Sequence, residues 1–210
     1  MNGVASGYAI FFTWRYSVEN VTKYAKDFHP ILCCFKGFFM YEVLDISKEI
    51  RETCGAHGYL DASNLTNQIE IWSPNVTLEG DGYVLSQQTT KDIFKRLAKL
   101  MKGEEITGRF SYLNDFLNII QDPPKIKFTR SVETMLEIIK YSLIHQIMVT
   151  GSNLRKKNNM SLDEKWNKAY LMDIIHTAWL NAIYISCSIF YEQIQTAELS
   201  DGLYNTLLRL

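Results

Sequence analysis

Apolar residues recur at intervals of three and four along most of this chain, and no other feature constrains its fold as strongly. One such series is Leu32, Phe35, Phe39, Val43, Ile46 and Ile50. This spacing puts the side chains on one face of a helix. Further helices are predicted over 83–102, 110–120 and 131–150, and another begins at Ser161. Because no alternating series of useful length predicts a strand, the chain is predicted to be all-α, a helical bundle of about six helices.

Proline, glycine and capping residues mark the ends of these helices. An earlier apolar series consists of Val4, Tyr8, Phe11, Val18 and Val21. His29-Pro30 is predicted to separate this first helix from the next, since a residue before proline avoids the helical region. Gly55 follows the second helix, where a left-handed cap favours glycine. Ser161 and Glu164 have the spacing of a capping box, which predicts the start of the last helix.

Composition and charge exclude several classes of protein. Apolar residues make up 47% of the 210 residues, which is typical of a globular chain. The net charge of -1 gives no general attraction to nucleic acid or to anionic membranes. The basic segment NLRKKNN after Gly151 is predicted to be a solvated loop. Four cysteines without a CxxC pair predict buried thiols in a reducing compartment.

Residues 174–191 contain no Asp, Glu, Lys or Arg, and their length is at the edge of what spans a bilayer. The polar residues within this segment are His176, Thr177, Asn181, Ser186 and Ser188. They lower its hydrophobicity and favour a buried helix over a helix in or against a membrane. Membrane contact through 174–191 stays open as the alternative.

Cys54 and His57 have a spacing that metal sites use. Two ligands do not make a zinc site, and no matching pair occurs elsewhere, so no metal site is predicted. The same two residues lack a third, orienting group for nucleophilic catalysis. His145 and His176 lie in apolar helices and are predicted to be core histidines.

Glu79 stands in a short polar stretch, Leu78-Glu79-Gly80-Asp81-Gly82, just before a predicted helix. A carboxylate there is stabilised by the helix N-terminus. If it is instead desolvated beside a substrate, its pKa rises and it can act as a general base. The residues alone favour a cap or a surface charge.

Two motifs resemble the acyl-CoA oxidase family, part of the acyl-CoA dehydrogenase superfamily. The first is Arg51-x-x-Cys54-Gly55-Ala56-His57-Gly58-Tyr59, where the family typically has R-x-x-C-G-G-H-G-Y. The second is Thr77-Leu78-Glu79-Gly80-Asp81, where the family has T-Y-E-G-D. Further matches follow in the family's order at 88–91, 108–113 and 164–167. The chain is identified as a member of this family over its C-terminal helical part.

The resemblance implies two partial helical domains: 1–106, like the family's third domain, and 107–210, like its C-terminal domain. It also implies an FAD-dependent oxidation of fatty acyl-CoA in β-oxidation, with oxygen as the final acceptor. Glu79 would remove the α-proton. The cofactor-binding residues would be Gly55, Ala56, His57, Gly58, Tyr59, Gly80 and Asp81. Since glycines let a backbone come close to a cofactor, 51–82 would form the lip of the cofactor and substrate site.

The chain departs from the family's pattern at a few positions. Ala56 stands in place of the second glycine of the first motif, and Gly82 in place of an asparagine after Asp81. Asn64 and Thr66 stand in place of a glycine and a proline in the turn between the motifs. Together these changes suggest relaxed demands on the site. The family's N-terminal helical and β-barrel domains have no counterpart here, so the chain alone is expected to be inactive.

Three interpretations follow. In the first, the chain is part of a working oxidase whose other domains lie elsewhere. In the second, it is a non-catalytic remnant that serves as a structural subunit of a larger assembly, where other protein subunits cover an exposed apolar face. In the third, it carries acyl-CoA or FAD without turnover. The family points to peroxisomes, and a mitochondrial setting is left open.

Overall fold

The computed structural model describes residues 21–129, 131–157, 159–197 and 202. Within these residues it is helical and contains no strand, which confirms the all-α prediction. The long helices are α2 (Val21–Thr53), α4 (Gly82–Leu100), α6 (Val132–Arg155) and α8 (Leu171–Thr196). The shorter elements are η1 (Gly55–Tyr59), η2 (Asp61–Ser63), α3 (Leu65–Trp72), η3 (Ser73–Val76), η4 (Gly108–Asp115), α5 (Phe116–Gln121), α7 (Leu162–Glu164) and the π-helical η5 (Lys165–Ala169).

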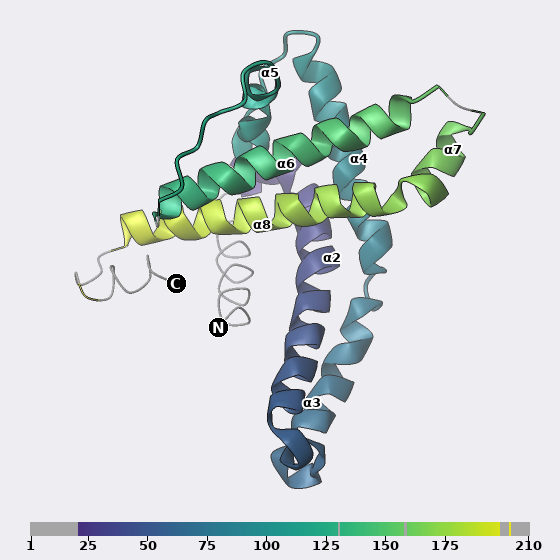
Figure 1. The fold of residues 1–210 in the computed structure, drawn as a ribbon, viewed down its shortest axis with the longest axis vertical. Helices are drawn as coiled ribbons and strands as arrows, with labels where there is room; N and C mark the ends of the chain where they lie inside the picture. The colour runs from purple at the N-terminus through teal and green to yellow at the C-terminus, as the bar shows by residue number, and fades with distance from the viewer. Residues whose placement is uncertain (1–20, 130, 158, 198–201, 203–210) are drawn as a thin grey trace.

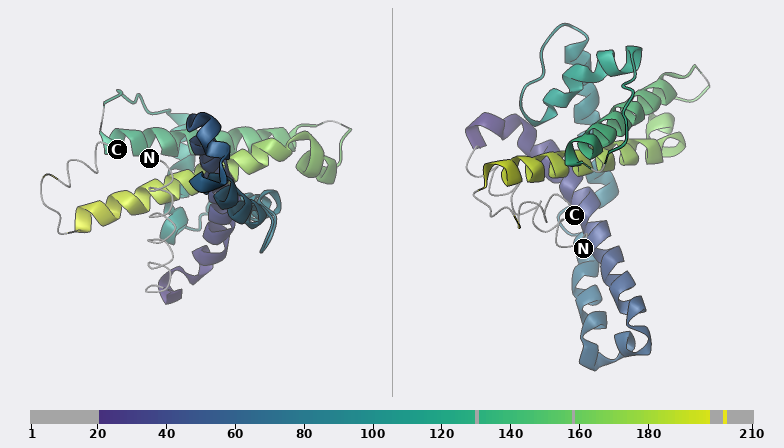
Figure 2. Two further views of the ribbon diagram at one scale, coloured as in Figure 1. Left: turned by 90° about the horizontal axis from the view of Figure 1, so that it is seen from below. Right: turned by 60° about the vertical axis from the view of Figure 1, so that its left-hand side comes forward.

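The long helices form a crossed body from which an arm projects. Helices α6 and α8 lie side by side, and α2 and α4 cross them (Figure 1). Beyond this crossing, the C-terminal part of α2 continues downward in the view, and the chain returns along it through α3 and η3 to α4 (Figures 1 and 2). Residues 40–81 are called the arm below.

The hydrophobic core lies in the body, where α4, α6, α8 and η4 meet. Its fully buried side chains include Ile93, Phe110, Leu113, Leu143, Ile144, Ile147, Ile174, Ile175, Ile185 and Ile189. In the arm, by contrast, only Leu44, Gly58 and Val76 are buried. Removal of apolar surface from water is the main favourable term in folding. The body therefore carries most of that term, and within the arm residues 54–81 pack against the C-terminal part of α2.

The predicted break at His29-Pro30 is wrong, because α2 runs through both residues. Proline removes one backbone donor and bends a helix without always ending it. The purple N-terminal turns of α2 point in a different direction from the rest of the helix (Figure 2). At the proline itself, Thr89 Oγ1 of α4 donates to the Pro30 carbonyl over 2.8 Å. Apart from Val21, the residues of the predicted earlier helix lie outside the described residues.

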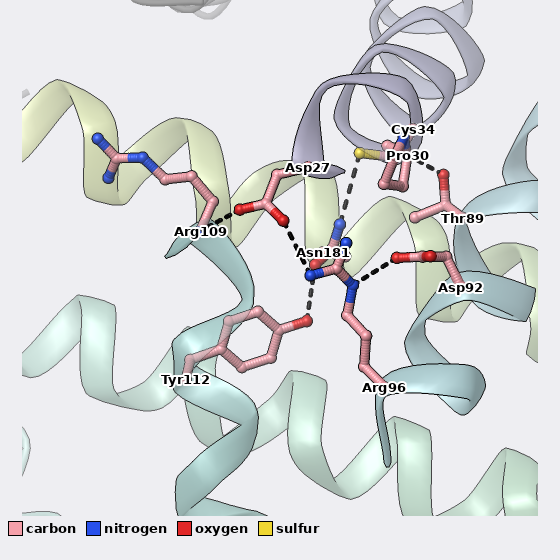
Figure 3. Close-up of polar contacts among 9 residues, drawn as sticks. All are labelled: Asp27, Pro30, Cys34, Thr89, Asp92, Arg96, Arg109, Tyr112 and Asn181. Carbon is pink, nitrogen blue, oxygen red and sulfur yellow. Dashed lines mark hydrogen bonds and ion pairs between the residues drawn. The ribbon is translucent and has the colours of Figure 1, made fainter. Parts of the chain in front are cut away.

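A buried ionic cluster fixes the bent part of α2 to the body (Figure 3). Asp27 accepts hydrogen bonds from Arg96 Nη1 at 2.8 Å and from the backbone N–H of Arg109 at 2.7 Å. Arg96 Nε also donates to Asp92 at 2.5 Å. A Cβ on Gly108 would lie 2.2 Å from Asp27 Oδ2, so glycine is required for this approach. A buried carboxylate is tolerated when it is paired and hydrogen-bonded in this way.

A second buried polar group links α2, α8 and η4 beside this cluster (Figure 3). The Tyr112 hydroxyl donates to Asn181 Oδ1 over 2.7 Å, and Asn181 Nδ2 donates to Cys34 Sγ over 3.5 Å. All three side chains are buried. Since a buried amide without partners is costly, these bonds fix the register of α8 against α2.

The apolar series on α2 was predicted only in part. Phe35 and Phe39 are buried, but Leu32 is 39% and Ile50 is 49% exposed. Near Leu32, the residues that face the core are Ile31 and Cys34. Ile50 lies in the arm, where no second layer of helices covers the apolar face.

The other helix boundaries were predicted with mixed success. The Ser161–Glu164 capping box is present as predicted. The helix that follows is interrupted by η5 before α8 begins. Helix α6 extends to Arg155, so the first residues of the basic segment are helical rather than loop. The predicted 110–120 helix is η4 followed by α5.

Helix α8 contains the uncharged segment 174–191. In the part of the chain that the structure describes, α8 is the one helix long and apolar enough to cross a membrane, by length and composition only. Half of its most apolar window is buried inside the protein. The buried-helix prediction thus holds for that half, and membrane contact stays a prediction.

Candidate functional site

Glu79 lies on a tight turn between η3 and α4. Its φ is 60° and that of Gly80 is 112°, so two successive residues adopt a backbone that L side chains rarely take. The Glu79 side chain is exposed. Its carboxylate makes no hydrogen bond or ion pair with any residue that the structure describes. The turn therefore presents a free carboxylate on the surface of the arm.

Asp81, rather than Glu79, caps α4. Its Oδ1 accepts hydrogen bonds from the backbone N–H groups of Tyr83 at 2.9 Å and Val84 at 3.2 Å. This is the usual arrangement of an aspartate N-cap. The two carboxylates thus have different roles. Asp81 accepts the free N–H groups at the start of α4, and the Glu79 carboxylate is left to face solvent.

Lys36 on α2 holds this turn from the other side. Its ammonium Nζ donates to the Val76 carbonyl over 2.9 Å and also to the Gly80 carbonyl. Partial burial lowers the pKa of Lys36, while the nearby charges of Asp81 and Glu79 act in the opposite direction. Sequence analysis did not identify Lys36, because a lysine beside an apolar helix face gives no signal of its own.

A seam of small residues lets α2 and α4 approach at this point. A Cβ on Gly37 would lie 2.6 Å from Ser86 Oγ and 2.8 Å from the Gly82 carbonyl oxygen. A Cβ on Gly82 would lie 2.6 Å from a ring carbon of Tyr41. Gly82 therefore has a packing reason to be glycine. Its departure from the family's asparagine does not by itself indicate a relaxed site.

The first motif forms the tip of the arm. Gly55 has φ 56°, as the predicted left-handed cap requires, and open space surrounds its Cβ position. Ala56, His57 and Tyr59 are exposed. Gly58 is buried, and a Cβ there would lie 2.2 Å from the Arg51 carbonyl oxygen. Gly58 thus serves the packing of the tip against the end of α2, while the other residues of the motif face outward.

The tip and the Glu79 turn contact α2 at different positions along its axis. Tyr59 packs against Arg51, whose guanidinium carbon is 4.3 Å from the Tyr59 ring centroid, while the Glu79 turn is bonded to Lys36. Residues 36 and 51 of one helix are separated by about 22 Å along its axis. The structure thus separates the two motifs that were predicted to form one lip, and a single ligand contacts both only if it is long.

Asn64, in the turn between the motifs, has φ 56°. Asparagine is among the few residues other than glycine that adopt this conformation readily. Asparagine therefore suits the left-handed backbone at this position.

Aromatic side chains surround the start of α4 on the side of the body. Ring centroids of Tyr41 and Tyr83 are 5.5 Å apart, and each is 6.3 Å from that of Trp179. Burial raises the pKa of the Tyr41 hydroxyl, and the charge of Asp81 adds to this effect. Among the described residues, the buried Trp179 Nε1 has no hydrogen-bond partner. These rings lie beside the start of α4, which directly follows the Glu79 turn.

Two of the weaker motif matches meet around a cleft. Trp166 Nε1 donates to Gln87 Oε1 over 2.8 Å, which joins η5 to α4. The adjoining cleft has a volume of about 600 Å³. It is lined by Gln87, Gln88, Lys91, Leu162, Asp163 and Trp166.

The predictions for histidine and cysteine were partly wrong. His145 and His176 are exposed instead of lying in the core, because each sits one residue off the buried face of its helix. Cys33 and Cys34 are buried as predicted, but Cys54 is exposed. Within the described residues, no group of three or more His, Cys, Asp or Glu side chains is arranged to hold a metal ion.

The known proteins that this chain resembles in sequence are acyl-CoA oxidases. A family model described as "Acyl-CoA oxidase, C-alpha1 domain" matches residues 3–94. Peroxisomal acyl-coenzyme A oxidase 1 of Mus musculus is 22% identical over 210 residues, which cover 91% of this chain and 32% of the relative. Peroxisomal acyl-coenzyme A oxidase 1 of Arabidopsis thaliana is 25% identical over 206 residues, which cover 91% of this chain and 31% of the relative. The chain thus spans about a third of the length of these relatives.

Solved structures show the same fold. The acyl-CoA oxidase LeACX1 of Lycopersicon esculentum matches with a TM-score of 0.85 and 24% identity, covering 97% of this chain and 33% of that one. Acyl-CoA oxidase-2 of Caenorhabditis elegans, bound with FAD, ascaroside-CoA and ATP, matches with a TM-score of 0.79 and 18% identity, covering 97% of this chain and 32% of that one. At these identities the likeness establishes the fold alone.

Proposed function

The chain belongs to the acyl-CoA oxidase family, as its C-terminal helical part, and on this premise we propose that Glu79 is the base that removes the α-proton of a fatty acyl-CoA. The observation that carries the proposal is the free carboxylate of Glu79 on a turn fixed from both sides. A general base needs an unoccupied lone pair and a fixed position within hydrogen-bond reach of the proton. Glu79 has the first, and its turn provides the second.

The residues around Glu79 have separate roles in the proposed proton abstraction. Asp81 caps α4, so its carboxylate is engaged and contributes through the geometry of the turn. Gly80 supplies a φ of 112°, which a side chain would disfavour. When an acyl-CoA covers the turn and excludes water from it, the Glu79 carboxylate takes the α-proton. The electron pair left by the α-proton then forms the α,β double bond as the β-hydrogen departs.

The tip of the arm suits an approach to FAD by its backbone. Space is open around the Cβ position of Gly55, and His57 and Tyr59 are exposed beside it. FAD, when bound, would accept the β-hydrogen as a hydride. Because the tip lies well away from Glu79 along α2, we assign Gly55, Ala56, His57 and Tyr59 to the edge of a cofactor site and not to the proton transfer. Gly58 would shape that edge only through the packing of the tip.

The described part of the chain by itself is proposed to be inactive. Glu79 and most of the tip are exposed to water, and an open carboxylate lacks the enclosed substrate that proton abstraction needs. Enclosure would come from protein outside the described residues, in the same polypeptide or in another. Since the relatives are named peroxisomal, we propose peroxisomes as the site of action.

The test is an absorption spectrum of the protein purified in its native assembly. A flavin band that bleaches when a fatty acyl-CoA is added without oxygen supports the proposal. Glu79→Gln should then slow the bleaching by at least about 100-fold while the band remains. Glu70→Gln, the same change at another exposed glutamate of the arm, should bleach normally. Equal bleaching by Glu79→Gln and the wild type contradicts the role of Glu79.

One observation favours a second candidate function, that of a non-catalytic structural subunit. Helix α3 has no buried residue, and its Ile71 and Trp72 are 54% and 40% exposed. Adjacent exposed apolar side chains form a patch of the kind that marks a protein interaction surface. An assembly of unrelated proteins without flavin supports this function. Flavin or acyl-CoA bound without turnover instead indicates a carrier.

A further inference from the structure

We propose that Lys36 is a positioning residue that fixes the turn on which Glu79 stands. The inference rests on the proposed role of Glu79 as the base. Lys36 does not touch the substrate in this proposal, and it acts through the backbone on both sides of Glu79.

The contacts of Lys36 span the turn. Its ammonium donates to the carbonyl of Val76, three residues before Glu79, and to the carbonyl of Gly80, one residue after it. A charged donor shared between two carbonyls is stronger than a neutral hydrogen bond. The five-residue segment is thereby curled around one cation, with the Glu79 side chain facing outward.

This bridge offsets a conformational cost. A glutamate at φ 60° costs of order 1 kcal/mol or more and persists only when its surroundings impose it. The backbone N–H groups of Thr77 and Leu78 both bond to the Pro74 carbonyl, at 3.1 and 2.9 Å, so η3 holds the segment at its start. Lys36 is the side chain that holds it across Glu79, before the Asp81 cap begins α4.

The contact between α2 and α4 places Lys36 beside the turn. Gly37, the next residue on α2, allows α4 to approach until Ser86 and Gly82 occupy the space of its missing Cβ. Because α4 begins at Gly82, this contact sets the distance between α2 and the turn. The small-residue seam and the lysine bridge are therefore parts of one arrangement that orients Glu79.

The experiment compares Lys36→Met, which keeps the aliphatic stem and removes the donors, with Lys36→Arg, which keeps the charge. Lys48→Met is the matched control, since Lys48 is an exposed lysine of the same helix that forms a surface ion pair with Asp45. Hydrogen–deuterium exchange of residues 76–81 is measured in the native assembly without acyl-CoA. We expect exchange in Lys36→Met to be about 10- to 100-fold faster than in the wild type, and unchanged in Lys48→Met.

The second measurement is anaerobic bleaching of the flavin against acyl-CoA concentration. Lys36→Met should lower the limiting rate by about tenfold or more while half-saturation is unchanged, and Lys36→Arg should restore most of the rate. Faster exchange with an unchanged limiting rate reduces Lys36 to a stabilising contact and overturns its positioning role. Unchanged exchange in Lys36→Met overturns it as well.

Failure of the proposed function is distinguishable from failure of this inference. If the wild-type assembly does not bleach, or if Glu79→Gln bleaches normally, Glu79 is not the base and the positioning role falls with it. If the wild type bleaches and Glu79→Gln does not, but Lys36→Met behaves as Lys48→Met in both measurements, only the inference about Lys36 is wrong.

Discussion

Replacing Asp27 with asparagine should destabilise the protein more than any exposed charge substitution on α2. Asp27 is 3% exposed and accepts hydrogen bonds from Arg96 Nη1 and the Arg109 backbone N–H. Charge-assisted hydrogen bonds contribute about 1.5–3 kcal/mol each. Asparagine keeps one acceptor oxygen but loses the charge, and it removes the ion pair between residue 27 and the Arg96 guanidinium, which is 15% exposed. We therefore expect a loss of about 2–4 kcal/mol in the free energy of unfolding.

Urea denaturation followed by far-ultraviolet circular dichroism measures this loss. Asp45→Asn is the control, because Asp45 is a 66% exposed partner of Lys48 on the same helix. That change should cost less than about 0.5 kcal/mol. The reasoning is refuted if Asp27→Asn costs no more than Asp45→Asn. A further check is that Asp27→Leu with Arg96→Met should be less damaging than Asp27→Leu alone, since the guanidinium that loses the Asp27 carboxylate is removed with it.

Three other outcomes follow from the structure. Gly82→Ala should lower the free energy of unfolding by about 1–3 kcal/mol in the same assay, because its methyl group overlaps an aromatic ring. Hydrogen bonds from Ser161 lower the pKa of the Glu164 carboxyl, so its stabilising effect is present above about pH 4.5 and is lost as the pH falls through the lowered folded-state value. The stability difference between wild type and Glu164→Gln should accordingly disappear in acid. Maleimide should label exposed Cys54 quickly, and Cys34 only on unfolding, because burial raises the pKa of the Cys34 thiol.

Periodicity predicted the helices of the body because their apolar faces pack against one another. Helices α4 and α6 and the capping box at Ser161 follow from local rules that no tertiary contact overrides. At Pro30 the local rule fails, because the contacts of Asp27 and Thr89 hold the helix on both sides of the proline. His145 and His176 show a different error. They were judged by the composition of their helices, whereas their angular position places them outside the buried face.

For the candidate site, the sequence suggested residues, whose roles stay predictions, but it could not give their arrangement. The resemblance identified Glu79 and the tip, but no local pattern reveals that Lys36 reaches the turn from α2 or that Asp81 is occupied as a cap. The departures from the family were also open to misinterpretation. Gly82 and Asn64 looked like signs of a relaxed site, yet one is required by the α2–α4 contact and the other suits the left-handed backbone that it adopts. Both explanations depend on tertiary geometry.

The arm connects the two candidate functions. It buries few of its own side chains, so its shape depends on α2, on the Lys36 bridge and on whatever protein covers it. If a cover encloses Glu79 and the tip, the same burial that stabilises the arm also makes the carboxylate a base. If a cover protects only Ile71 and Trp72, the arm is stabilised and Glu79 stays in water. Catalytic and structural roles thus differ in which face of the arm is covered. Solvent protection of residues 77–81, compared with that of 69–72 in the native assembly, separates them.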